Sequence, residues 1–100
     1  MCKCYILFSA SRNIYYTGFT TQSVEDRLGM HISGYYGPEK FTADLDDWKI
    51  FLIIACNSIS EARKIESHIE RMKSKKYIEN LKKHPEIIDR LKLMYSSDII

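Results

Sequence analysis

The chain has 100 residues, a length that supports one small domain with a single hydrophobic core. Its 45% hydrophobic and 28% charged residues are typical of a folded domain and argue against a disordered segment. The longest apolar run, Ile50–Cys56, is too short to span a bilayer, and no charged leader precedes an apolar segment. We therefore expect a cytoplasmic domain with no membrane association.

Three cysteines, at positions 2, 4 and 56, are too few and too unevenly spaced for a disulfide framework. This favours reduced thiols in the cytosol. Cys2 and Cys4 fall on the same side of a strand, so a zinc site is the alternative. No pair of Cys or His follows at a spacing that would complete four zinc ligands.

The net charge of +2 is unevenly distributed along the chain. Residues 1–62 contain five Lys or Arg and seven Asp or Glu, whereas residues 63–100 contain ten and six. Clustered cations attract polyanions whatever their sequence, so the second half predicts a phosphate-facing surface. A solvated helical face is the ordinary alternative.

Two short apolar runs that contain tyrosines, Cys4–Phe8 and Ile14–Phe19, are separated by polar turn formers. This pattern predicts a β-hairpin. Strand propensity and packing alone could explain the tyrosines. Gly18 interrupts the second strand, where a glycine often marks a bulge or a close approach to the backbone.

Helical spacing runs over residues 24–31, after a polar segment suited to capping a helix. Arg27 and His31 are four residues apart and therefore share one face of this helix. Each has an ordinary alternative role. Arg27 could pair with Glu25 or Asp44, and His31 could be a helix-end histidine favoured by the helix dipole.

Residues 32–47 read as a long loop that is punctuated by Gly and Pro. The three acidic residues Asp44, Asp46 and Asp47 fit solvated loop charge better than a metal site, because no further ligands accompany them. Trp48–Cys56 follows and is apolar almost throughout. We expect it to be the central strand of a small sheet, with both faces covered.

Ser58 and Glu61 form a capping-box pattern, from which a helix is predicted to run to about Lys73. Its buried stripe consists of Ala62, Ile65, Ile69 and Met72. Glu66 lies roughly 80° from the middle of that stripe, at the edge of the core. A half-buried carboxylate needs a cation, a metal or a proton. A salt bridge to Arg63 or Lys73 is the alternative.

A basic run, Lys73–Lys76, precedes another apolar stripe with helical spacing. Pro85 breaks this helix, and a last helix is predicted over Glu86–Tyr95, before a frayed end. It could cap the core or present an apolar face to a second copy. We expect residues 1–82 to form the main domain and residues 83–100 to pack on it or extend it.

Several chemistry-bearing residues follow one another in a fixed order: Tyr5, Tyr16-Thr17-Gly18, Arg27, His31 and Glu66. This order resembles the GIY-YIG nuclease family. The chain is most similar to its minimal single-domain members, which are related to the incision subunit of nucleotide-excision repair. The resemblance implies an α/β (α+β) fold, in which helices flank a small three-stranded antiparallel sheet.

The resemblance also implies metal-dependent hydrolysis of a DNA phosphodiester, with a structure-selective role in DNA repair or recombination. Glu66 would hold Mg²⁺ or Mn²⁺, and Arg27 would bind the scissile phosphate. A phenol, Tyr5 or Tyr16, would act on the attacking water with the help of His31. Gly18 would have a structural role. The expected DNA-binding residues are Arg63, Lys73, Lys75 and Lys76.

Some positions depart from the family pattern. Lys3 and Cys4 occupy the first two places of the first triplet, and Thr17 the middle of the second. Phe19 stands where some family nucleases carry a lysine, and Ile78 where several carry an asparagine. The alternative is therefore a non-catalytic DNA-binding or partner-docking module with the same fold. A homodimer or a protein partner could supply specificity to either.

Overall fold

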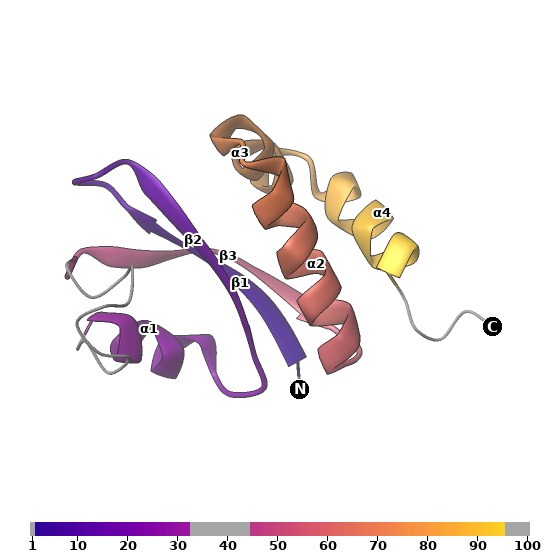
Figure 1. Ribbon diagram of the computed structural model, residues 1–100, viewed down its shortest axis with the longest axis horizontal. Helices are drawn as coiled ribbons and strands as arrows, with labels where there is room; N and C mark the ends of the chain where they lie inside the picture. The colour runs from indigo at the N-terminus through magenta and orange to yellow at the C-terminus, as the bar shows by residue number, and fades with distance from the viewer. Residues whose placement is uncertain (1, 33–44, 96–100) are drawn as a thin grey trace.

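The computed structural model describes residues 2–32 and 45–95. Most of the predicted long loop, residues 33–44 with Asp44, lies outside the described residues, as do residue 1 and the terminal residues 96–100. The elements are β1 (Cys2–Ser9), β2 (Ile14–Thr20), α1 (Val24–Ile32), β3 (Trp48–Cys56), α2 (Ile59–Met72), α3 (Lys75–Lys83) and α4 (Pro85–Tyr95). In Figure 1, α1 lies on one side of the sheet and α2, α3 and α4 lie on the other. The predicted fold class is confirmed.

The three strands form one antiparallel sheet in the order β2-β1-β3. The prediction that Trp48–Cys56 is the central strand is therefore wrong, because β1 lies in the middle and β3 at an edge. Its faces are not both covered either, since Ile53 is 41% exposed. An apolar run shows that a strand is buried somewhere along its length, but it does not show how many strands pair with it.

A β-bulge explains why β3 is apolar on both faces. The pairing with β1 shifts between Ile6 and Leu7, which leaves Phe51 as an extra residue. Trp48 therefore packs with the cluster on the α1 side, and Ile54 packs with the cluster under α2. A bulge reverses the side-chain alternation of the strand beyond it.

Each face of the sheet covers its own hydrophobic cluster. On the α1 side the buried members are Tyr5, Leu7, Val24 and Trp48. The larger cluster lies under α2, α3 and α4, and its buried members include Cys4, Ile6, Ile54, Ala62, Ile65, Ile69, Ile78, Leu81 and Leu91. Of the two tyrosines predicted to be functional, Tyr5 therefore belongs to the smaller cluster and Tyr16 packs against it.

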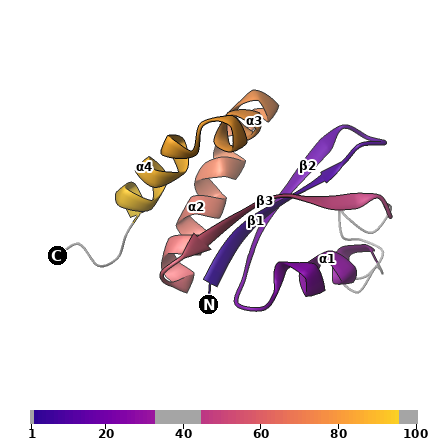
Figure 2. The same cartoon turned by 180° about the vertical axis from the view of Figure 1, so that it is seen from behind.

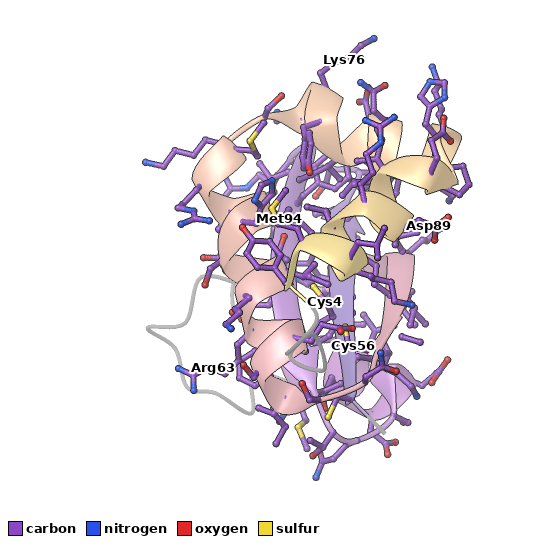
Figure 3. All side chains as sticks on the ribbon, turned by 90° about the vertical axis from the view of Figure 1, so that its right-hand side faces the viewer. Cys4, Cys56, Arg63, Lys76, Asp89 and Met94 are labelled. Carbon is purple, nitrogen blue, oxygen red and sulfur yellow. The ribbon has the colours of Figure 1, made fainter. Side chains whose placement is uncertain are left out.

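The thiols of Cys4 and Cys56 lie in the larger cluster, between the sheet and the helices (Figure 3). Burial is the main cause that raises the pKa of both thiols. Both cysteines are free and their thiols stay protonated at neutral pH. Among the described residues, no group of three or more His, Cys, Asp or Glu is placed to hold a metal ion.

Serine side chains cap the N-termini of three helices, α1, α2 and α3. The Oγ atoms of Ser23, Ser58 and Ser74 each accept a hydrogen bond from a backbone N–H three residues later, at 3.0–3.1 Å. At α2 the Glu61 carboxylate accepts in return from the N–H of Asn57. The contacts of Ser23 and Ser58 confirm the helix starts predicted there, whereas the cap at Ser74 was not predicted. All three contacts satisfy N–H groups that have no partner within the helix.

The buried stripe of α2 differs from the prediction at its two ends. Met72 was expected in the core but is 45% exposed, and Glu61, which was not expected there, is 1% exposed. Met72 lies in the last turn, just before Lys73 ends the helix in a left-handed conformation with φ 47°. Helical spacing identifies a face but not where the neighbouring sheet stops.

Asp47 does more than carry loop charge. Its carboxylate accepts a hydrogen bond from Ser9 Oγ at 2.7 Å and another from the Ser11 N–H at 2.9 Å. The start of β3 is thereby joined to the turn between β1 and β2. The prediction of purely solvated charge is wrong for this residue.

The last helix caps the core, with Leu91 3% exposed in the larger cluster. Tyr95 at its end forms hydrogen bonds with His68 and Arg71 of α2. None of the helices in the described part of the chain is long and apolar enough to cross a membrane.

Candidate active site

A cavity of about 520 Å³ lies beside the edge strand β2. Its lining residues come from β1, β2, α1, α2 and the connection between β2 and α1: Tyr5, Tyr16, Gly18, Phe19, Thr20, Thr21, Arg27, Ile59 and Glu66. We call it the edge pocket. Figure 2 shows that α1 and α2 lie on opposite sides of the sheet. Residues of both helices nevertheless line this one cavity at the edge of β2.

The edge pocket brings together most of the residues predicted from the sequence. Tyr5, Tyr16, Arg27 and Glu66 all line it, although they lie far apart in the chain. The fifth predicted residue, His31, is 1% exposed and is not among the lining residues. It contacts two of the lining residues, Tyr5 and Tyr16, and its described link to the pocket is through them.

A hydrogen bond of 3.0 Å joins the Tyr5 hydroxyl to Nε2 of His31. Which partner donates depends on which ring nitrogen of the histidine carries the proton. The Tyr5 side chain is 2% exposed, so its ring is fixed by packing while its hydroxyl borders the cavity. The Tyr5 hydroxyl thus has a hydrogen-bond partner within the protein, and that partner can also carry a proton.

Gly18 makes this position of Tyr5 possible. The two residues are paired across the β1–β2 ladder. A Cβ atom at position 18 would lie 2.7 Å from the Tyr5 hydroxyl oxygen and 2.8 Å from the adjoining ring carbon. No side chain fits there without moving the ring. Gly18 was predicted to mark a bulge or a close approach to the backbone. The structure shows a close approach, in which the phenol of Tyr5 lies against the β2 backbone.

Tyr16 is held by aromatic neighbours on the α1 side of the sheet. Its ring centroid lies 4.7 Å from that of His31 and 6.5 Å from that of Tyr5. Trp48 packs edge-on against it, with centroids 6.5 Å apart. Tilted and edge-on packing is favourable for such rings and restricts the rotation of Tyr16.

Arg27 is half-buried, and its Nε donates a hydrogen bond of 3.0 Å to Thr20 Oγ1. Thr20 is 2% exposed, and the same hydroxyl accepts from the Gln22 N–H at 2.9 Å. These contacts hold the guanidinium at the wall of the pocket. Thr20 was not predicted as a site residue, because its role depends on how the strand turns into α1.

Glu66 is half-buried and is the one carboxylate among the described residues that line the edge pocket. A single carboxylate does not make a complete cage for an ion. Mg²⁺, however, is commonly bound by one or two carboxylates, with substrate phosphates and water completing its octahedron. The donors around the pocket therefore fit a divalent cation that the substrate helps to hold.

The predicted DNA-binding residues occupy different places. Arg63 lies near the edge pocket, with its guanidinium carbon 6.0 Å from the centroid of the Phe19 ring. Lys73 and Lys75 line a neighbouring cavity that shares Tyr16 with the edge pocket. Lys76 lines none of these cavities and extends away from the body of the molecule, at the opposite end from Arg63 (Figure 3).

In a comparison with models of protein families, the model for the GIY-YIG catalytic domain matches residues 1–80 of this chain. The chain belongs to the GIY-YIG family. The match includes all the strands, α1, α2 and most of α3, and leaves α4 outside. No curated protein matches the chain, and neither does any solved structure. The family is one of nucleases, so the edge pocket is the candidate active site of this GIY-YIG domain.

Three of the positions that depart from the GIY-YIG pattern, Cys4, Phe19 and Ile78, belong to the larger cluster or pack against it. Cys4 is fully buried in the larger cluster, and Ile78 is 8% exposed in the same cluster. Neither lines the edge pocket. Phe19 does line it and forms an apolar part of the wall, beside the guanidinium of Arg63. Two of the altered positions therefore leave the edge pocket itself unchanged.

Proposed function

We propose that this GIY-YIG domain is a metal-dependent endonuclease that hydrolyses a phosphodiester bond in DNA. The observation that supports this most is the shared cavity of Arg27, Glu66, Tyr5 and Tyr16. A guanidinium, a carboxylate and two phenols supply a phosphate contact, a cation ligand and hydroxyl groups for a water molecule.

In this proposal Arg27 binds the non-bridging oxygens of the scissile phosphate. Its planar guanidinium suits two parallel hydrogen bonds to phosphate, and these strengthen as charge accumulates on those oxygens. Thr20 fixes the direction of Nε. A guanidinium that is oriented before the substrate arrives loses little free energy in reorganising during the reaction.

The hydroxyl of Tyr5 orients the attacking water, and His31 exchanges a proton with that hydroxyl across their 3.0 Å hydrogen bond. An isolated phenol has a pKa near 10, so it is a weak base at neutral pH. A histidine partner makes proton transfer through the phenol more favourable. When bound at Glu66, Mg²⁺ or Mn²⁺ neutralises the charge that develops on the leaving oxygen.

The basic side chains Arg63, Lys73, Lys75 and Lys76 bind flanking phosphates in this proposal. Their arrangement in more than one place favours a substrate that extends past the edge pocket on both sides. A domain of this size has little room for base readout, so we propose that DNA structure, a homodimer or a protein partner supplies selectivity. We place this activity in DNA repair or recombination in the cytoplasm.

Nicking of supercoiled plasmid by the purified chain tests the proposal. We expect nicking with Mg²⁺ or Mn²⁺ and none with EDTA. Glu66→Gln should lower the rate at least about a hundredfold, because the cation contributes several kcal/mol in the transition state. Glu25→Gln is the matched control, because it removes the same charge from an exposed position of α1 and should nick like the wild type.

Two outcomes would count against the proposal. Nicking by Glu66→Gln at the wild-type rate would remove the assigned role of this carboxylate. Tight DNA binding by the wild type without nicking under any metal condition would instead support a non-catalytic binding module.

A further inference from the structure

A second cavity, of about 540 Å³, adjoins the edge pocket and shares Tyr16 with it. It lies between β2, the end of α2 and the start of α3. Apolar and aromatic residues form much of its lining: Ile14, Tyr15, Tyr16, Ile69 and Ile78. Its polar lining residues are Thr17, Glu70, Lys73, Ser74 and Lys75. We call it the side pocket.

Tyr15 gives the side pocket a firmly held aromatic ring. Its centroid lies 4.8 Å from that of Phe8 and 5.1 Å from that of Phe51, which packs edge-on against it. The three rings come from the three strands and are all half-buried. A ring held in this way can stack against a flat ligand at little cost in side-chain entropy.

Two ammonium groups border the same cavity. Lys73 and Lys75 are both exposed and flank Ser74, the residue that caps α3. Lys73 holds a left-handed conformation, and Lys75 is the first residue of α3. An apolar, aromatic pocket bordered by lysines matches a ligand that is flat and apolar at one end and anionic at the other.

A nucleotide has this chemistry, and the edge pocket next door is the place proposed for a phosphodiester. We propose that the side pocket takes up an unpaired base next to the scissile phosphate, with Lys73 and Lys75 on the adjoining phosphates. This inference rests on the proposed function. It names the substrate class as DNA with a single-stranded arm, because a base within a duplex must first be unstacked and unpaired before it can enter a pocket, whereas an unpaired base avoids most of that cost.

Glu70 is the one carboxylate among the described residues that line the side pocket. It repels phosphate but can accept a hydrogen bond from an amino group on the edge of a base. A pocket built for phosphate alone would not place a carboxylate beside its lysines. Its presence therefore favours a base over a bare anion.

The test measures binding without cleavage. Fluorescence anisotropy in EDTA compares labelled DNA that carries a single-stranded flap with plain duplex of equal length, using the Glu66→Gln chain. We expect tighter binding to the flap. Adding Tyr15→Ala should lower flap affinity about tenfold through lost stacking, whereas Tyr15→Phe should keep it. The ratio of the flap and duplex affinities should therefore fall towards one only in the alanine variant.

Charge-matched variants separate the side pocket from general basicity. Lys73→Glu with Lys75→Glu should reduce the preference for the flap far more than Lys83→Glu with Lys92→Glu. Lys73→Gly is the variant to use if Tyr15→Ala does not fold, because glycine suits the left-handed backbone at that position. It should also reduce the flap preference.

If the Glu66→Gln chain without a change in the side pocket bound the flapped DNA and the plain duplex equally tightly, the inference would be overturned. So would an equal loss of affinity for both DNAs in Tyr15→Ala, or an undiminished flap preference in Lys73→Gly. None of these results depends on catalysis, so each leaves the nuclease proposal standing. Conversely, a clear flap preference in the Glu66→Gln chain, combined with a wild-type chain that nicks DNA under no metal condition, would defeat the nuclease proposal alone.

Discussion

At the scale of single residues, the candidate site depends on a few contacts that position its reactive groups. Thr20 orients Arg27, Gly18 leaves room for Tyr5, and His31 bonds to the hydroxyl of that tyrosine. These contacts join β2 to α1, β2 to β1 and α1 to β1. Together they form one side of the edge pocket, which α2 completes with Glu66.

Thr20→Val tests how far Arg27 depends on its hydroxyl partner. Valine has nearly the same shape, but it removes the acceptor for Nε and for the Gln22 N–H. We expect kcat/KM for DNA cleavage to fall about tenfold or more, since the loss of positioning costs catalysis. Thr20→Ser keeps the hydroxyl and should restore most of the rate. Equal activity of the valine and serine variants would show that the contact does not matter.

Much of the residue-scale picture could be predicted from the sequence. The order of Tyr5, Tyr16, Arg27 and Glu66 in a recognisable pattern was enough to place them in one site. Thr20 could not be predicted in this way, because its role comes from the bend between β2 and α1. His31 was predicted as a helper, but its burial against Tyr5 depends on packing that no spacing shows.

At the scale of elements, Asp47 joins the β1–β2 turn to the first residues of β3. The hydrogen bond from the Ser11 N–H is the largest cause that holds the pKa of this carboxyl below its usual value, followed by that from the Ser9 hydroxyl. The native state therefore favours the ionised carboxylate more than the unfolded chain does. The resulting stabilisation is present above the unfolded pKa of aspartate.

The pH dependence of unfolding tests this contact. Stability from Asp47 should be lost as the pH falls from the unfolded pKa through the lower, folded pKa. Asp47→Asn should lower the melting temperature at about pH 7 and converge with the wild type once the pH has fallen below the folded pKa of Asp47. The exposed neighbour Asp46 provides the control, because Asp46→Asn should follow the wild-type curve. Parallel curves for wild type and Asp47→Asn would contradict the assignment.

Most elements could be predicted from apolar periodicity and capping residues, since Ser23 and Ser58 mark the starts of α1 and α2. The strand order could not. An apolar run at Trp48–Cys56 suggested a central strand, but its two apolar faces come from the bulge at Phe51. A bulge depends on pairing with β1, which lies far away in the sequence.

At the scale of the whole molecule, the two clusters on either side of the sheet set the two walls of the edge pocket. The α1 cluster holds Tyr5, and the larger cluster holds α2 and therefore Glu66. We propose that α4 belongs to this same domain, although the family match ends before it. Its Leu91 is buried among residues of the larger cluster.

Leu91→Ala tests the contribution of α4. The leucine is 3% exposed, so removing its side chain should destabilise the domain by about 2–4 kcal/mol. Leu93→Ala on the same helix removes the same atoms from a side chain that is 70% exposed, and should cost less than about 0.5 kcal/mol. Urea unfolding measures both. Equal and small losses would show that α4 is an appendage rather than part of the core.

The central claim is that Glu66 of α2 holds a divalent cation in the same pocket that Arg27 of α1 and Tyr5 of β1 line. Line broadening of backbone amide NMR signals by paramagnetic Mn²⁺ tests it most directly, in wild type and in Glu66→Gln. The account predicts that broadening at Tyr5, Gly18 and Arg27 appears in the wild type and disappears in the variant. Identical broadening in the two proteins, or a difference confined to residues remote from the edge pocket, would contradict it.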